Sequence, residues 1–387
     1  MASRHPVLTV SNFAQIGEAR LEFGDLTVLV GPQATGKSLL LQWLKAACDP
    51  GEIVHALKEA GHDVKTPDNL LALIFGEGME KAWHQGATTV QFEGKPVDPA
   101  AWARTAKKRS EGRVFFIPAH RALLLAEGWP APFQKLNADT PVVARLFSQN
   151  LYQRFSGRQA APLFPVERIL KEQYRQSIPR AFFHGGRVEL EKEGLRYRLR
   201  LAFDGGVKLP YMTWTAGQRE FTPLLLGLYH VLLPRKEAKR EEIDWVVIEE
   251  PEMGLHPQAI AVFMLLVLDL LWRGYRVVIS THSPLVLDVV WAIRRLAEHR
   301  GRPQLLCDAF ELRPSGPLKR VMSSALTRSY RVFFLDLDSK TRRMRSRDIS
   351  NLDPDSLESA EADWGGLTAF STRFGEAVRK AVNEGDG

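Results

Sequence analysis

The sequence predicts an α/β protein whose core is a largely parallel sheet, and three features predict it. Residues 26–45 read as an apolar strand, a glycine-containing loop and a helix. Residues 245–248 and 276–280 are apolar on both faces, which is typical of strands in a covered parallel sheet. Between them, residues 260–272 form an apolar run of helical length.

The composition is that of an ordinary globular protein. Hydrophobic residues make up 45% and charged residues 25% of the 387 positions, enough to bury one elaborated domain or two. No signal segment opens the chain, and the run at 260–272 contains Asp269 and is too short to span a bilayer. Cys48 and Cys307 suggest no disulfide framework. We expect a cytoplasmic protein without a membrane partner.

The formal charge of +7 allows an acidic partner such as nucleic acid, but it also suits a mildly basic enzyme. Arginines alternate along one predicted strand, at Arg196, Arg198 and Arg200. A second basic group covers residues 342–347. Each group is either a contact surface for phosphates or a solvated strand face, and the sequence leaves both interpretations open.

Residues 31–38 (Gly-Pro-Gln-Ala-Thr-Gly-Lys-Ser) fit the phosphate-binding loop G-x-x-x-x-G-K-[ST] at every fixed position. Its glycines let backbone N–H groups point inward, and the following helix adds its positive end. We expect Lys37 to reach the β- and γ-phosphates of ATP, and the Ser38 hydroxyl to contact Mg²⁺. The expected nucleotide contacts are Gly31, Gln33, Thr35, Gly36, Lys37, Ser38 and Leu39.

Three later segments carry matching chemistry. An apolar strand ends in Glu249 and Glu250, where one carboxylate can hold Mg²⁺ and its neighbour can orient or deprotonate water. Another ends in His282, which can sense a γ-phosphate. The turn at 213–220 opens a helix whose first N–H groups, from Thr215 to Gly217, offer a second anion site.

This set of motifs resembles the ABC-type ATPases, specifically the soluble branch with RecF, the SMC proteins and the OLD-like ATPases. Residues 215–220 (Thr-Ala-Gly-Gln-Arg-Glu) look like the signature turn, and residues 249–257 are similar to the extended Walker B of the OLD-like branch. Residues 281–284 match its switch histidine. The resemblance implies a P-loop ABC-ATPase fold, with a mixed sheet core, a helical signature lobe and β-hairpin additions.

The resemblance also implies a mechanism. Two copies, or a higher even number, would meet head to tail, with each ATP between one copy's loop and the other's signature turn. Thr215, Gly217 and Gln218 would then act in trans. Ser38 and Glu249 would hold Mg²⁺, Glu250 would be the catalytic base and His282 would read the γ-phosphate during hydrolysis of ATP to ADP and phosphate.

Two departures from the family pattern predict slow hydrolysis. Gln33 and Ala34 replace the usual Asn-Gly, and alanine tolerates less unusual backbone geometry than glycine. Glu249 stands where many cassettes carry Asp. The usual Q-loop glutamine is not identifiable, so the pair His120 and Arg121 is the candidate for a further polar contact near the nucleotide.

We expect four segments. Residues 1–125 would form the first cassette half with a variable insert, and residues 126–212 a helical and hairpin insert, with a helix at 166–176 and a hairpin turning at 193–194. Residues 213–300 would carry the signature helix, Walker B and the switch histidine. Residues 301–387 would form a hairpin, turning at 339–340, and a tail.

The biological role is inferred from absences and analogy. The sequence contains no heptad run long enough for an SMC-like coiled-coil tether. Asp336 and Asp338 resemble a Toprim nuclease site only superficially. The chain therefore resembles ATPase subunits of anti-phage systems such as PARIS and Septu, and the PARIS subunit is the nearer of the two. This resemblance implies a separate effector, such as a Toprim nuclease, and a phage protein or DNA as the trigger. The alternatives are a RecF-like repair ATPase on duplex DNA, and an ATP-gated scaffold with negligible turnover.

Overall fold

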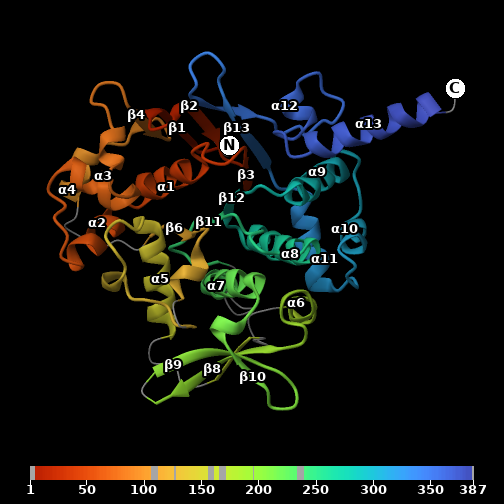
Figure 1. The fold of residues 1–387 in the computed structure, drawn as a ribbon, viewed down its shortest axis with the longest axis horizontal. Helices are drawn as coiled ribbons and strands as arrows, with labels where there is room; N and C mark the ends of the chain where they lie inside the picture. Colours follow the sequence, from red (N-terminus) through yellow and green to blue (C-terminus); the bar gives the residue numbers. More distant parts are fainter. Residues whose placement is uncertain are drawn as a thin grey trace.

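The computed structural model describes residues 5–105, 112–125, 128–155, 161–164, 171–194, 196–232 and 239–385. A ten-stranded mixed sheet forms the centre of these residues, and a four-stranded sheet lies at one end (Figure 1). The predicted α/β class with a mixed sheet and hairpin additions is confirmed.

The large sheet has the order β5-β4-β1-β2-β14-β13-β3-β12-β11-β6. From β13 to β6 all neighbours are parallel, as predicted for the apolar strands. On the other side of β13 the pairs are antiparallel, except that β14 and β2 are parallel. The strands are β1 Val7–Phe13, β2 Ile16–Glu22, β3 Leu26–Val30, β4 Thr89–Phe92, β5 Lys95–Pro96, β6 Val114–Ile117, β11 Trp245–Glu249, β12 Arg276–Ser280, β13 Tyr330–Leu337 and β14 Met344–Asp348.

Two hydrophobic cores cover the two faces of this sheet. Because successive strand residues point to opposite faces, Val28 of β3 belongs to one core and Leu29 to the other. Core helices on the Leu29 face are α1 Lys37–Cys48, α2 Pro50–Glu59 and α3 Pro67–Phe75. Core helices on the Val28 face are α6 Glu172–Ile178, α7 Ala216–Val231, α8 Pro257–Arg273, α9 Pro284–Glu298, α10 Pro303–Ala309 and α11 Gly316–Ala325.

The remaining helices complete the ends of the fold. Helix α5 contributes Val143 to one core and Phe147 to the other. The remaining helices are α4 Pro99–Thr105, α5 Val142–Phe155, α12 Ser359–Ala362 and α13 Ala369–Gly385. The short helical turns are η1 Met79–Ala82, η2 Arg121–Leu124, η4 Phe133–Lys135, η5 Pro179–Phe183 and η6 Tyr211–Thr213. None of the described helices combines the length and hydropathy needed to span a bilayer.

The small sheet contains the predicted hairpin. It comprises β7 Ala161–Phe164, β8 Arg187–Glu193, β9 Arg196–Ala202 and β10 Lys208–Pro210, in the order β10-β9-β8-β7. Strand β7 was not predicted, because its proline-containing segment reads as broken helix. Of the predicted helix 166–176, residues 166–170 lie outside the described residues, and α6 begins at Glu172.

The C-terminal hairpin lies inside the large sheet. Strand β13 pairs in parallel with β3, the strand that enters the phosphate-binding loop, and β14 pairs with β2. Val332, Phe333 and Leu335 are buried because both faces of β13 are covered. The large sheet therefore unites strands from the first, third and fourth of the expected segments, while the four-part division itself stays a prediction.

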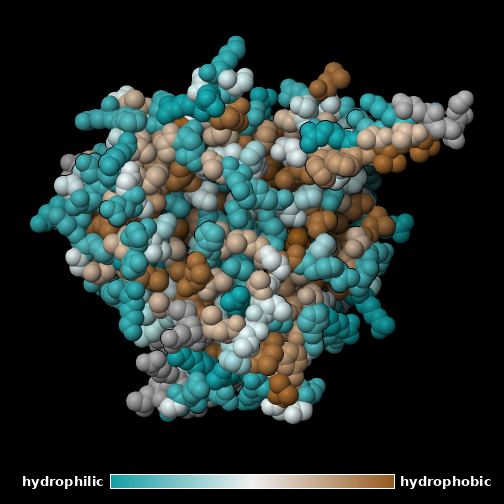
Figure 2. Space-filling view, viewed as in Figure 1, coloured by the Kyte–Doolittle hydropathy of each residue, from teal (hydrophilic) through white to brown (hydrophobic). Residues whose placement is uncertain are grey.

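Helix α13 carries an apolar stripe that the other described residues leave exposed. Phe370, Phe374, Val378 and Val382 recur every four residues and are each more than half exposed. The Phe370 and Phe374 rings lie 4.7 Å apart. Figure 2 shows hydrophobic residues along the side of this projecting helix.

A partly buried histidine predicts a pH dependence of folding. His230 of α7 stacks on Phe115 of β6 with ring centroids 4.8 Å apart, and burial, aided by Arg240, lowers its pKa to about 3. The unfolded state therefore takes up a proton below about pH 6.5 that the folded state refuses.

We expect acidification from pH 7 to pH 5 to cost about 2 kcal/mol of unfolding free energy through His230 alone. His230→Phe, which keeps an aromatic ring on Phe115, should flatten urea-unfolding stability over this range. The control is His299→Phe at an exposed position. An unchanged pH slope in His230→Phe would contradict the assignment.

Candidate functional site

The phosphate-binding loop joins β3, which is buried throughout, to α1. Gly31 has φ +143°, and a Cβ there would lie 2.7 Å from the Leu335 carbonyl oxygen of β13. Gly36, the N-cap of α1, has φ +89°. Both fixed glycines of the motif are therefore required by backbone geometry, as the motif predicts.

Ala34 takes the backbone geometry that the sequence analysis questioned. Its φ is +60°, in the left-handed region, and its carbonyl accepts a hydrogen bond from Gln15 Nε2 at 3.2 Å. A non-glycine residue pays about 1–2 kcal/mol for this conformation. The loop thus stores strain at the position where related loops carry glycine.

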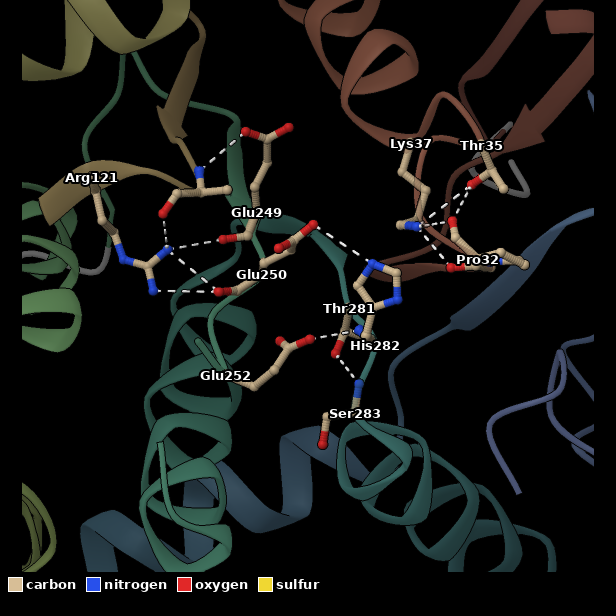
Figure 3. A network of polar contacts seen from close by, with 12 residues as sticks. Pro32, Thr35, Lys37, Arg121, Glu249, Glu250, Glu252, Thr281, His282 and Ser283 are labelled. Atoms are coloured by element: carbon tan, nitrogen blue, oxygen red, sulfur yellow. Dashed lines mark hydrogen bonds and ion pairs between the residues drawn. The ribbon is translucent and has the colours of Figure 1, made fainter. Parts of the chain in front are cut away.

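The Lys37 side chain is buried and folded back onto its own loop. Its Nζ donates to the carbonyls of Gly31 and Pro32, both at 2.8 Å (Figure 3). Burial lowers the pKa of Lys37, while Glu250 and Glu252 act in the opposite direction. The ammonium therefore sits in the field of both carboxylates, and a bound phosphate would replace loop carbonyls as its acceptor.

The parallel pairing of β3, β12 and β11 brings the predicted strand-end residues to one edge of the sheet. Glu249 is buried there, where its Oε2 accepts from the Ala119 backbone N–H at 3.2 Å. Burial raises the pKa of Glu249 to about 7, while the nearby Ser38 hydroxyl acts in the opposite direction. Its Oε1 is buried without a hydrogen-bond partner.

Glu250 and His282 form the second half of this edge. The Glu250 Oε1 and His282 Nε2 atoms are 3.7 Å apart. Glu250 has φ +41°, a left-handed conformation, and its N–H donates to the Ser280 carbonyl at 2.9 Å. The His282 backbone N–H donates to Glu252 Oε1 at 2.5 Å. Burial, reinforced by Lys37, lowers the His282 pKa, which favours the neutral imidazole.

Arg121, expected to contact the nucleotide, instead lies inside the fold. Its side chain is fully buried, and its guanidinium donates to the carbonyls of Glu249 at 3.0 Å and Glu250 at 3.3 Å (Figure 3). It also donates to the Glu220 carbonyl at 2.9 Å. His120 is exposed and lines a cavity of about 660 Å³ beside Glu249 and Glu250. Only His120 of the pair is therefore open to that cavity.

The signature turn forms a complete helix cap in its own chain. Thr215 is the N-cap of α7, its hydroxyl accepts from the Gln218 N–H, and the Gln218 side chain accepts from the Thr215 N–H. Gly217 packs so closely that a Cβ there would lie 2.4 Å from the Gly254 carbonyl oxygen. The buried Gln218 side chain is thus used in cis, and the trans roles of Thr215, Gly217 and Gln218 stay predictions.

The sequence did not predict the positioning roles of Glu252 and of the buried Arg121. Glu252 could have been noticed because it belongs to the Glu-Pro-Glu stretch at residues 250–252, but the sequence analysis gave it no role of its own. Arg121 had no signal, because its acceptors are backbone carbonyls, and those of Glu220 and Glu249 lie far from it in the sequence.

Several charged groups outside the site pair within the chain. Asp336 pairs with Arg347 and Asp338 with Arg345, each at 2.8 Å. In the described ranges no group of three or more His, Cys, Asp or Glu side chains could hold a metal ion. Asp336 and Asp338 are thus each paired with an arginine of the same hairpin.

Arg200 of the small sheet is also paired, with Glu191 at 3.1 Å and Glu193 at 3.2 Å. The Arg196 side chain lies outside the described residues. Arg343 donates to Asn12 Oδ1 at 2.7 Å. The basic strand faces are therefore partly neutralised by neighbouring groups of the same chain.

Residues 101–288 match the family described as "AAA domain, putative AbiEii toxin, Type IV TA system". This match covers just under half of the chain and includes Glu249, Glu250 and His282, but it begins after the phosphate-binding loop. Among curated proteins, none matches the chain.

Two solved structures illustrate the similarity. An SMC head bound to the C-terminal winged-helix domain of ScpA is 11% identical, with a TM-score of 0.45, over 92% of this chain and 98% of that one. The SMC head domain from Thermotoga maritima is 14% identical, with a TM-score of 0.33, over 74% and 92% of the two chains.

The chain therefore has an α/β fold with a phosphate-binding loop, and its residues 101–288 are similar to the AAA-domain family. In the sheet, β12 lies between the loop strand β3 and the carboxylate strand β11.

The left-handed Ala34 predicts a stabilising substitution. Ala34→Gly should raise the free energy of unfolding by about 0.5–1 kcal/mol, because relief of strain exceeds the added flexibility of the unfolded chain. Ala46→Gly, inside α1, is the matched control and should lower it by a similar amount. Urea denaturation measures both, and equal signs for the two variants would refute the strain at Ala34.

Proposed function

We propose that the protein binds MgATP at the loop 31–38 and hydrolyses it in a head-to-tail dimer or higher even oligomer. One observation carries this proposal: Ser38 of the loop lines the same cavity as Glu249 and Glu250, while Glu250 and His282 approach each other at the same sheet edge. A generic phosphate-binding loop would need none of these partners. Their convergence supports ATP hydrolysis rather than phosphate binding alone.

The described residues fit a magnesium ion. Glu249 Oε1 is a buried carboxylate oxygen without a partner, and Ser38 lines the same cavity as Glu249, so hard oxygen ligands lie near one another. Ser38 and Glu249 would hold Mg²⁺, which when bound would supply charge neutralisation on the phosphate oxygens. The raised pKa of Glu249 leaves this carboxyl partly protonated near pH 7, so the ion must compete with a proton.

The chain's own groups divide the remaining work. Lys37 would exchange the carbonyls of Gly31 and Pro32 for phosphate oxygens, and Glu250 would accept a proton from the attacking water. A neutral His282 beside Glu250 can accept or donate one hydrogen bond at each ring nitrogen, which suits a sensor of the γ-phosphate. The strain at Ala34 and the protonation of Glu249 support slow turnover.

For the biological role, we propose an AriA-like sensor or scaffold ATPase of a bacterial anti-phage system. The matched family's description refers to a toxin and a toxin–antitoxin system, which supports control of a separate effector such as a Toprim nuclease. A phage protein or DNA would serve as the trigger. The internal pairing of Arg200, Arg345 and Arg347 favours this role over a RecF-like enzyme that grips duplex DNA.

Two substitutions test the ATPase. Lys37→Ala should abolish MgATP binding in calorimetry, because the loop loses its only phosphate-directed ammonium. Glu250→Gln should keep binding and lower phosphate release by roughly 100-fold or more. Undiminished affinity in Lys37→Ala would refute the site, and equal near-background release by wild type and Glu250→Gln would instead support an ATP-gated scaffold.

A salt titration tests the role. We expect the purified protein to show little duplex-DNA affinity at physiological salt, because Arg200, Arg345 and Arg347 are already paired with carboxylates of the same chain. It should instead co-purify with the product of a neighbouring gene. Tight, strongly salt-dependent DNA binding without such a partner would favour the RecF-like alternative.

A further inference from the structure

Arg121 is the most completely engaged buried charge near the candidate site. Its guanidinium reaches three separate segments through backbone carbonyls: the end of β6 at Pro118 (3.2 Å), the end of β11 at Glu249 (3.0 Å) and the first turns of α7 at Glu220 (2.9 Å). In Figure 3 it lies behind the carboxylate loop, away from Lys37.

We propose that Arg121 is a positioning residue that couples the Glu249–Glu250 loop to the signature helix α7 of the same chain. This inference rests on the proposed head-to-tail ATPase. In such an assembly the carboxylates serve the chain's own ATP, while the signature turn serves the ATP of the neighbouring copy. A clamp between them links two ATP sites.

The geometry of Glu250 supports the clamp. Glu250 is held in a left-handed conformation, with φ +41°. Its N–H is fixed by the Ser280 carbonyl at 2.9 Å, and its own carbonyl accepts from Arg121 Nη2 at 3.3 Å. Because both sides of this strained peptide are pinned, the direction of the Glu250 side chain depends on where Arg121 lies.

A second contact joins the same two segments. Gly217 of the signature turn lies against Gly254, just after the carboxylates, and a Cβ on Gly217 would approach the Gly254 carbonyl oxygen to 2.4 Å. The turn and the carboxylate loop are thus held together at Gly217 and at Arg121. Displacing either segment displaces the other, because buried close contacts shift as units rather than deform smoothly.

Only a planar guanidinium can make these contacts at once. Lysine keeps the charge but presents a single nitrogen, which cannot reach both the Glu220 and the Glu250 carbonyls. Arg121→Lys therefore separates charge from coupling. Arg113→Lys is the matched control, since Arg113 precedes β6 at its other end and pairs with the Asp244 side chain at 2.7 Å.

The first experiment measures the coupling between the nucleotide site and the signature turn without relying on ATP hydrolysis. Hydrogen exchange of residues 216–222 is measured with and without a non-hydrolysable ATP analogue, alongside its binding affinity. In wild type and Arg113→Lys, the analogue should protect this turn. Arg121→Lys should bind the analogue through Lys37 and Ser38 but lose the protection, and its ATP turnover should fall roughly 100-fold, as for a displaced catalytic group.

The second experiment mixes subunits. Wild type is combined with increasing fractions of Arg121→Lys, and turnover is measured at saturating MgATP. Coupling predicts a fall steeper than the loss of wild-type chains, because variant signature turns also impair the wild-type carboxylates they face. A purely local structural role predicts a linear fall, and mixing with the control Arg113→Lys should cause no fall at all.

The outcomes separate this inference from the proposed function. Retained protection in Arg121→Lys, or a linear mixing curve, overturns the coupling while leaving the ATPase intact. Absence of nucleotide binding by the wild type overturns both. If Arg121→Lys does not fold, the same experiment is done with Gly217→Ala, whose added Cβ would push the signature turn away from Gly254. This variant must show the same loss of protection. If it keeps the protection, the coupling is refuted.

Discussion

Parallel pairing of three buried strands is the constraint on which the candidate site depends. Because β11, β12 and β3 run side by side in the same direction, their carboxyl ends meet at one edge. Glu249, His282 and the loop after Val30 follow these ends. A register slip of one residue would turn Glu249 to the opposite face, so the apolar pairing within the sheet also sets the positions of the polar groups.

The site concentrates strain and desolvation that the surrounding fold must hold. Ala34 and Glu250 are both left-handed without being glycine, and Glu249 is a carboxyl group buried with one unpartnered oxygen. Such features persist only where neighbours over-determine them. Here the neighbours are Arg121, which binds the backbone on one side, and β13, which packs against the start of the loop.

Electrostatics inside the chain change the meaning of its net charge. A charge of +7 suggests an anionic surface partner. Yet Arg200, Arg345 and Arg347 have carboxylate partners, and the most buried guanidinium, Arg121, faces carbonyls. Positive charge in this chain therefore partly serves architecture. The exposed apolar stripe on α13 is the more unusual surface feature of the described residues.

The sequence by itself determined the α/β class, the loop 31–38 and the pairing of carboxylates with a strand-end histidine, because these depend on local spacing and hydropathy. Only the tertiary structure decided that β13 lies beside β3 and that Arg121 points inward. These outcomes join segments far apart in the chain. Their acceptors are mostly backbone carbonyls, which leave no mark on side-chain pattern, so no reading of residue types could have predicted them.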